Sequence, residues 1–360
     1  MRKIQRILIA NRGEIALRII RTVREMNIEA VAVYEKQDRD AYFHRFADRV
    51  VQIGDEPNRG YLDIERIIRA AVNTGADAIH PGYGFLSENA DFAQACQEAG
   101  IIFIGPPPAV IRDLGNKVYA RQMMAKAGIP VVPGTESLPA GREGVEAAAS
   151  FAARAGYPII LKATAGGGGR GVRRIDNEQE LKLNVAAARA EALAAFHDDR
   201  LYAEKYVEKP RHVEVQILAD QYGHVIHLGT RDCSIQRRHQ KLLEIAPAGL
   251  PAPVCDRIQE AAVLAAKTAG YVNAGTVEFL VDSRTHEFWF MEVNTRLQVE
   301  HTVTEMITGE DLVQEQIRIA EGRPLQIRQE EVRLHGIAIE VRINAEDPRN
   351  NFLPEGGKLI

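Results

Sequence analysis

Two neighbouring strand-like segments, 276–281 (TVEFLV) and 288–294 (FWFMEVN), each carry a glutamate, and this pair constrains the fold more than any other feature. A polar connection separates the segments. If they form an antiparallel hairpin centred near Thr285, Glu278 lies directly opposite Glu292, with about 5 Å between their Cβ atoms. Two carboxylates at that separation repel each other, and a divalent cation would remove the conflict.

A third oxygen ligand follows on the same side of the second strand. Asn294 lies two residues beyond Glu292, and alternate residues of a strand face the same way. Carboxylate and amide oxygens suit Mg²⁺, or Mn²⁺ in its place, held jointly with phosphates. The alternative is that one glutamate faces solvent and pairs with a surface lysine or arginine. The pattern favours a metal site made by Glu278, Glu292 and Asn294.

Composition excludes several classes of function. The chain has 360 residues, 46% hydrophobic and 26% charged, which is typical of a globular protein of two or three domains. A net charge of −4 gives no reason to expect a nucleic-acid or membrane partner. The three cysteines form no C-x-x-C pair, and the N-terminal apolar run 7–10 is too short for a signal peptide. We therefore expect a cytoplasmic protein.

Residues 1–114 alternate strand and helix patterns, as in a parallel sheet covered by helices on both faces. The expected strands are 6–10, 30–34, 50–53, 76–80 and 101–104, and the expected helices follow 11–14, span 61–72 and follow 87–89. No G-x-G-x-x-G motif follows the first strand, so a nicotinamide cofactor is not expected. The loop 80–85 (HPGYGF) is either a ligand loop at the end of a strand or a tight turn. The run GPPP (105–108) indicates a boundary, and a helix over 117–127 follows.

A glycine-rich loop, 164–172 (TAGGGGRGV), follows the expected strand 158–163. Successive backbone N–H groups in such a loop can face an anion, and the loop can close over phosphates. The P-loop pattern is absent. A flexible linker is the alternative, which Lys162 on the strand and Arg170 inside the loop make less attractive. Lysines, glycines and a metal site together indicate binding of ATP phosphates.

The segment 212–218 (HVEVQIL) alternates strictly, which predicts a half-exposed antiparallel strand paired with 225–228. The basic run that follows, 232–241, is either a solvated face or an anion site. Its basic residues are Arg237, Arg238, His239 and Lys241.

Three polar residues follow the proposed metal site at alternate positions. Arg296, Gln298 and Glu300 could hold a small anion and deprotonate it. The alternative is a simple salt bridge between Arg296 and Glu300. A further alternating strand from 335 onward places Glu340 and Arg342 on one face.

Taken together, eight motifs resemble the biotin carboxylase family, the ATP-grasp subunits or domains of acetyl-CoA, acyl-CoA and pyruvate carboxylases. The resemblance covers the whole chain. The motifs are NRGEIALRIIR (11–21), HPGYGFLSENADFA (80–93), FIGP (103–106), KATAGGGGRGVR (162–173), EKYVEKPRHVEVQ (204–216), RDCSIQRRHQKLLEIAP (231–247), EVNTRLQVEHTVTEMITG (292–309) and EVRINAEDP (340–348).

The resemblance implies an α/β fold in three parts. These are an N-terminal Rossmann-like parallel-sheet domain (1–114), an ATP-grasp domain (115–334) with a lid at 131–203, and the incomplete beginning of a β-rich C-terminal domain (335–360). It implies an ATP-dependent ligase that uses ATP and bicarbonate to carboxylate biotin on a biotin carboxyl carrier protein. The reaction would pass through carboxyphosphate and give ADP and phosphate. Further partners would be a carboxyltransferase subunit, which chooses the final acceptor, and a second copy of the chain if the third domain is complete.

The resemblance also implies individual roles. The implied metal ligands are Glu278, Glu292 and Asn294. The implied contacts to the ATP phosphates are Lys117, Lys162, Gly168, Gly169 and His239. Those to the adenine and ribose are Glu204, Val207, His212 and Gln236. Those to bicarbonate are Lys241, Arg296, Gln298 and the backbone of Val299. Glu300 would be the general base, and Arg342 would stabilise the biotin enolate.

Two alternatives stay open. One is another bicarbonate-activating ATP-grasp ligase of the carbamoyl-phosphate synthetase kind, and free-biotin-dependent ATP turnover would separate the two. The other is a catalytically impaired fragment that binds only ATP or partners. Thr302 and Val341 stand where the family usually has Pro and Cys. Because the family's third domain normally continues past 360, we expect apolar surface to be exposed where it would pack.

Overall fold

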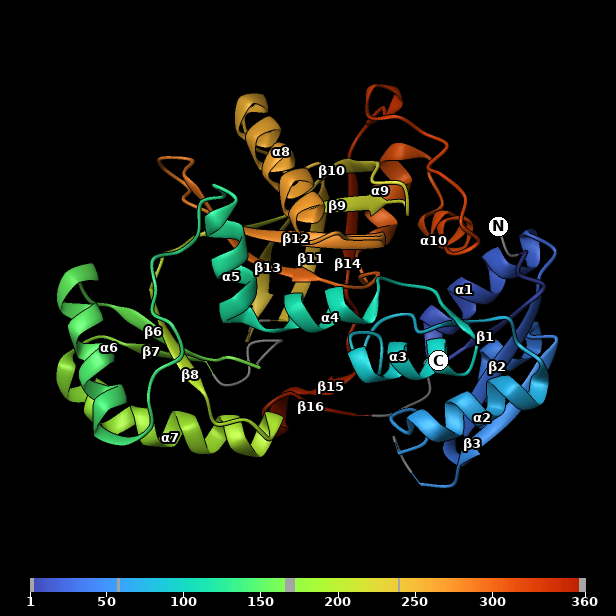
Figure 1. Cartoon of the computed structure of the whole chain (residues 1–360), viewed down its shortest axis with the longest axis horizontal. Coiled ribbons are helices and arrows are strands. Elements are labelled where there is room, and N and C mark those ends of the chain that lie inside the picture. Colours follow the sequence, from blue (N-terminus) through green and yellow to red (C-terminus); the bar gives the residue numbers. More distant parts are fainter. Residues whose placement is uncertain (1–2, 57–58, 166–171, 239, 356–360) are drawn as a thin grey trace.

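A computed structural model gives the architecture and describes residues 3–56, 59–165, 172–238 and 240–355. The α/β class expected from the sequence is confirmed. A five-stranded sheet, a three-stranded sheet and a central six-stranded sheet carry most of the fold (Figure 1). None of the described helices has the length and apolar character needed to span a membrane. The short elements are β15 (Glu346–Asp347), β16 (Leu353–Pro354), η1 (Lys36–Asp38), η2 (Tyr42–Phe46), η3 (Gln329–Glu331) and η4 (Pro348–Asn350).

The N-terminal sheet is wholly parallel, with the order β3-β2-β1-β4-β5. Its strands are β1 (Arg6–Ile9), β2 (Glu29–Glu35), β3 (Arg49–Gly54), β4 (Ala78–His80) and β5 (Ile102–Phe103). Its helices are α1 (Gly13–Glu25), α2 (Ile64–Thr74) and α3 (Ala90–Glu98). Ile7 and Ile9 enter one hydrophobic cluster and Leu8 another, so β1 is buried on both faces. Helix α2 begins later than expected, because Asp63 caps it by accepting from Arg66 N.

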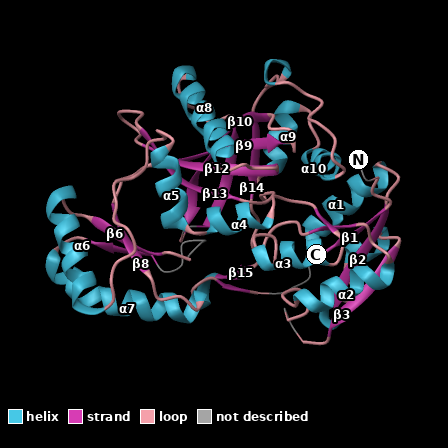
Figure 2. Ribbon diagram, viewed as in Figure 1, coloured by secondary structure: helices cyan, strands magenta, loops and turns pink. Residues whose placement is uncertain are grey.

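The three-stranded sheet forms a small unit at one end of the molecule (Figure 2). Its strands are β6 (Ile159–Ala163), β7 (Val172–Ile175) and β8 (Leu201–Lys205), and its helices are α6 (Gly141–Ala155) and α7 (Glu178–Phe196). The two helices and the sheet share one apolar core. Gly168, Gly169 and Arg170 of the glycine-rich loop lie outside the described residues.

The central sheet is antiparallel, with the order β13-β12-β9-β10-β11-β14. Its strands are β9 (Arg211–Ala219), β10 (Val225–Arg237), β11 (Gln240–Ala246), β12 (Asn273–Val281), β13 (Phe288–Asn294) and β14 (Ala338–Val341). The helices that share the apolar core of one face are α4 (Pro108–Gly115), α5 (Lys117–Lys126) and α8 (Ala252–Thr268). Helix α4 was not expected from the sequence, because GPPP suggested only a break.

The expectation that 212–218 is half-exposed is wrong. Val213, Val215 and Ile217 pack against the helices, as alternation requires, but Glu214 and Gln216 on the other face are also fully buried. Both accept hydrogen bonds from Arg231 of the neighbouring strand β10. The alternation therefore marks an apolar face and a polar face of the strand, and both faces are buried.

The predicted hairpin register is confirmed at its functional end. Glu278 pairs with Glu292, and Thr276 with Asn294. From Phe279 onward the pairing shifts by one residue, so Phe279 faces Phe290. This bulge leaves the two glutamates opposite each other.

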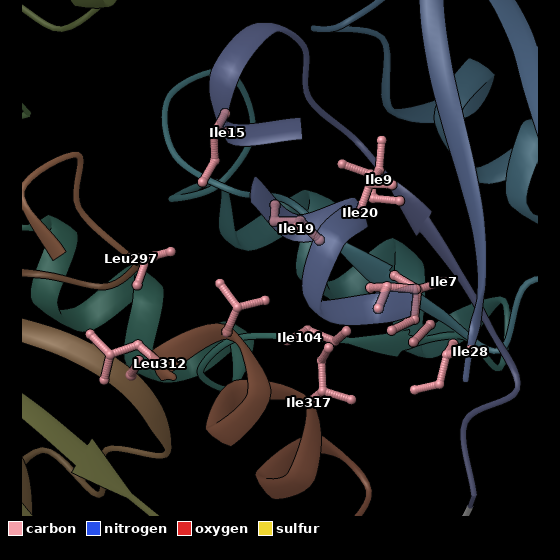
Figure 3. Close-up of a cluster of buried hydrophobic side chains, with 14 of the residues drawn as sticks. Ile7, Ile9, Ile15, Ile19, Ile20, Ile28, Ile104, Leu297, Leu312 and Ile317 are labelled. Atoms are coloured by element: carbon pink, nitrogen blue, oxygen red, sulfur yellow. The ribbon is translucent and has the colours of Figure 1, made fainter. Parts of the chain in front are cut away.

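A hydrophobic cluster joins the N-terminal sheet to the central sheet (Figure 3). Helices α9 (His301–Thr308) and α10 (Leu312–Ala320) follow β13, and α10 contributes Leu312 and Ile317 to this cluster. Leu297, in the loop between β13 and α9, is buried there too. The loop that carries Arg296 and Gln298 is thus anchored by its own apolar residue.

Replacing Ile317 by Ala should lower the free energy of unfolding by about 2–5 kcal/mol, since it removes a fully buried side chain. Urea denaturation would measure the loss. Met306→Ala is the control, because Met306 is 77% exposed and its truncation should cost less than about 0.5 kcal/mol. Equal effects of the two changes would contradict the packing of α10 described above.

Candidate active site

One cavity of about 810 Å³ brings together every predicted site residue that the structure describes. Its walls come from the three-stranded and the six-stranded sheets and from the loop after β13. The predicted residues in its lining are Lys117, Lys162, Glu204, Val207, His212, Gln236, Lys241, Glu278, Glu292, Asn294, Arg296, Gln298, Val299, Glu300 and Arg342. Gly168, Gly169 and His239 lie outside the described residues. The individual roles of these residues remain predictions.

Lys241 lies at the centre of a cluster of buried carboxylates. Its Nζ is 2.6 Å from Glu214, 2.6 Å from Glu300 and 3.0 Å from Glu278. Burial favours the neutral amine, but these three charges outweigh it and hold the pKa of Lys241 well above its usual range. The carboxylates face one another as metal ligands would, yet the position between them is occupied by an ammonium group.

The residues expected to bind metal form the adjoining part of the cavity wall. Glu278 accepts from Asn294 Nδ2 at 2.8 Å and from His212 Nε2 at 2.8 Å. Burial would raise the pKa of the Glu278 carboxyl, but Lys241 and His212 lower it well below its usual range. Glu292 is paired with Lys117. Two carboxylates and an amide oxygen at one end of a cavity fit Mg²⁺, and each carboxylate is held meanwhile by a basic side chain.

Glu300 immediately precedes α9 and is buried between two cations. Its carboxylate accepts from Lys241 Nζ at 2.6 Å and from Arg342 Nη2 at 2.8 Å. Burial raises the pKa of this carboxyl, but Lys241 and the nearby Arg231 lower it, to about 2. A general base works best with a pKa near the working pH. With these two cations beside it, Glu300 is a weak base.

The lysines expected at the ATP phosphates are already in ion pairs. Lys117 at the start of α5 contacts Glu292, and Lys162 on β6 contacts Glu204. Burial lowers the pKa of Lys117, but Glu292 outweighs it and the net effect is a raised pKa. Both side chains line the same cavity, as phosphate binding requires.

The basic run 232–241 separates into two groups. Lys241 faces the cavity, whereas Arg237 pairs with Glu346 and Arg238 donates to Asn351. The exposed Arg238 fits the interpretation as a solvated face, whereas the anion site at Lys241 stays a prediction. Arg296 pairs with Glu88 at 2.9 Å rather than with Glu300.

Residues 83–85 of the loop 80–85 line a different cavity, of about 670 Å³, over the start of α1. Tyr83 donates its hydroxyl to Glu14 at 2.6 Å there.

Sequence reasoning missed four residues that support the site. Glu88 accepts from Arg296 and from the backbone of Thr295, and Glu214 and Arg231 lie beneath Lys241 and Gln298. Glu244 accepts from Arg342 Nε at 2.7 Å. Burial raises the pKa of Glu244 to about 7, against the opposing effect of Arg342. The alternation of polar and apolar residues at 212–216 could have indicated Glu214, but it was interpreted as a sign that the polar side chains face solvent.

Two family descriptions match the chain. Residues 3–111 match "Biotin carboxylase, N-terminal domain", and residues 116–328 match "Carbamoyl-phosphate synthase L chain, ATP binding domain". The chain is 52% identical to biotin carboxylase 1 of Bacillus subtilis over 99% of its own length and 79% of the relative's. It is also 52% identical to the mitochondrial methylcrotonoyl-CoA carboxylase subunit alpha of Rattus norvegicus, of which it spans 50%.

A solved structure has the same fold. The biotin carboxylase domain dimer of the Hydrogenobacter thermophilus 2-oxoglutarate carboxylase, in complex with MgADP, ADP and bicarbonate, superposes with a TM-score of 0.94. The identity is 50%, over 98% of this chain and 78% of that chain.

Lys241→Met should lower the free energy of unfolding at pH 7 by about 3–5 kcal/mol, because it leaves buried carboxylates without their cation. The depressed pKa of Glu300 stabilises the fold above pH 4.5, and this contribution is lost as the pH falls toward 2. The difference in free energy of unfolding between wild type and Lys241→Met should therefore become smaller as the pH falls from 4.5 toward 2. Urea unfolding at several pH values measures it, with the exposed Lys126→Met as control. A gap independent of pH would contradict this account.

Proposed function

The chain belongs to the biotin carboxylase family of ATP-dependent ligases, and we propose that it carboxylates biotin with ATP and bicarbonate. The observation that carries this proposal is the union, in one cavity, of a phosphate-and-metal end with an anion end. The first holds Lys117, Lys162 and the three oxygen ligands, and the second holds Lys241, Arg296 and Glu300. A nucleoside triphosphate and a small anion can thus meet where they would react.

The phosphate end positions ATP. Lys117 and Lys162 would release their carboxylate partners and bind phosphate oxygens. Glu278, Glu292 and Asn294 would hold Mg²⁺ or Mn²⁺, which when bound neutralises charge on the phosphates. Glu204 and Val207 line the same cavity near the lid, where the adenine would lie.

The anion end activates bicarbonate. Lys241, Arg296 and Gln298 would bind it, and Glu300 would accept its proton. The resulting oxyanion attacks the γ-phosphorus of ATP, so ADP leaves and carboxyphosphate forms. Cleavage of its C–O bond gives CO₂ and phosphate. That phosphate takes the biotin N1 proton, N1 bonds to CO₂, and Arg342 stabilises the negative charge that develops on the biotin ring.

Membership of the biotin carboxylase family also indicates which partners this chain would have. A biotin carrier protein or domain would deliver biotin, and a carboxyltransferase subunit would use the product. A second copy of the chain is a further candidate. Apolar side chains on the outer face of β14 and its flanks are exposed, as expected for this stretch, and they are Ile337, Ile339, Val341 and Ile343. We place the reaction in the cytoplasm, in keeping with the free thiols of the chain.

A carbamoyl-phosphate synthetase-like reaction is the second candidate, because the description matched by 116–328 carries that name. It would use the same bicarbonate activation with ammonia in place of biotin. The match of 3–111 to the biotin carboxylase N-terminal domain favours biotin. ADP release stimulated by free biotin, but not by ammonium, would decide for biotin.

Glu300→Gln should lower the rate of bicarbonate- and biotin-dependent ADP release by about 10²- to 10⁴-fold, because it removes the proton acceptor. Glu287→Gln, an exposed change in the turn between β12 and β13, should leave the rate unchanged. If the wild-type chain binds ATP in a melting experiment but shows no biotin response, the proposal fails and the ATP-binding alternative holds.

Glu292→Gln should raise the Mg²⁺ concentration needed for half-maximal ADP release by roughly tenfold, since one charged oxygen ligand is lost. Electron paramagnetic resonance titration measures the affinity of the same site for Mn²⁺ without turnover. Unaltered Mn²⁺ binding would remove Glu292 from the metal site. Glu287→Gln again serves as the matched control.

A further inference from the structure

Arg231 on β10 is fully buried beneath the active site and donates to five different side chains. The acceptors are Glu214, Gln216 Oε1 (2.8 Å), Thr304 Oγ1 (2.9 Å), Gln298 Oε1 (3.0 Å) and Thr276 Oγ1 (3.1 Å). A guanidinium has five N–H donors and no acceptor. All five donors of Arg231 therefore have a partner, and none is left to contact a ligand.

One of these partners, Gln298, lines the cavity, whereas Arg231 lies behind it. A group with no acceptor can face only the oxygen of an amide, so Arg231 fixes which end of the Gln298 amide points toward it. On the opposite side, Gln298 Nε2 donates to Glu278 Oε1 at 3.0 Å. A flipped amide would set N–H groups against Arg231 and an oxygen against a carboxylate. The two contacts thus allow one orientation only.

This orientation decides what Gln298 offers to a ligand. One N–H of Nε2 binds Glu278, and the other belongs to the side of the amide turned away from Arg231. Lys241 and Arg296, which line the same cavity, are also donors without acceptors. The three N–H groups of Lys241 are held by Glu214, Glu278 and Glu300, so this side chain offers positive charge while Arg296 and Gln298 offer N–H groups. Positive charge and N–H donors together favour a small oxyanion over a neutral molecule that must also donate.

We infer that Arg231 is a positioning residue for bicarbonate: it locks the Gln298 amide so that its N–H group, and not its oxygen, faces the anion. This inference rests on the proposed function, since it assigns bicarbonate to that subsite. This effect of Arg231 on the anion would pass through Gln298, without contact between Arg231 and substrate or metal. Of its four other partners, Glu214, Gln216 and Thr276 lie on the neighbouring strands β9 and β12, and Thr304 lies on α9.

The first test compares Arg231→Met with Thr304→Val. Arg231→Met removes all the hydrogen bonds of Arg231, including the one to Gln298. Thr304→Val removes only the bond between Arg231 and Thr304. Arg231→Met should raise the KM for bicarbonate by about ten- to hundredfold, the cost of one charge-assisted hydrogen bond, and leave the KM for ATP nearly unchanged. Thr304→Val should leave both unchanged. Parallel increases in both KM values, or equal effects of both variants, would show a merely structural role.

A double-mutant cycle tests whether Arg231 acts through Gln298. Gln298→Ala alone should weaken bicarbonate binding, and adding Arg231→Met should weaken it no further. Independent, multiplicative losses would overturn the inference.

A second variant covers the case in which Arg231→Met does not fold. Arg231→Lys keeps a positive charge beside Glu214, so it should fold, but a lysine lacks the fixed fork of donors that holds the Gln298 amide. Its bicarbonate affinity should fall toward that of Gln298→Ala. Wild-type affinity in this variant would overturn the inference.

A binding measurement separates this inference from the proposed function. Titration of ¹³C-labelled bicarbonate, followed by nuclear magnetic resonance with MgADP present, reports affinity without turnover. If wild type binds bicarbonate but does not carboxylate biotin, the proposed function fails and the variants still decide the role of Arg231. If wild type binds no bicarbonate, both fail.

Discussion

The buried ammonium of Lys241 is the interaction on which the rest of the site depends. Lys241 lies on β11, and its side chain reaches across β10 to Glu214 of β9 and Glu278 of β12. It also contacts Glu300, the last residue before α9. Three carboxylates could not stay ionised in a buried space without a cation between them. One lysine thus holds three strands and a helix start in the arrangement that the chemistry needs.

The charges of the site balance in pairs, and substrates would rearrange those pairs. Lys117 holds Glu292, and Lys241 with Arg342 holds Glu300. A phosphate that takes Lys117 would free Glu292 for a metal, so binding of ATP and of metal favour each other. A bicarbonate that takes a share of Lys241 would likewise raise the pKa of Glu300 from about 2 toward a useful range. In the role proposed for it, Glu300 would then accept a proton well only when bicarbonate is present.

The sequence predicted features set by neighbouring residues and missed those set by distant ones. The parallel sheet and the pairing of Glu278 with Glu292 follow from local patterns, and both are confirmed. The burial of Glu214 could not be predicted, because its partners Arg231 and Lys241 come from other strands. Alternation indicates two faces of a strand but not what covers the second one.

The polar face of the central sheet is in effect a second core, made of hydrogen bonds and ion pairs. Its interior is saturated: Arg231 uses all five donors on five side chains, and Glu214 is shared with Lys241. Such a network is stable only when every member has a partner. At the edge of this network, Gln298 and Arg296 border the cavity. Leu297 between them is buried in the apolar cluster, so the edge stays fixed between two cores. The site thus lies at the edge of the network that supports it.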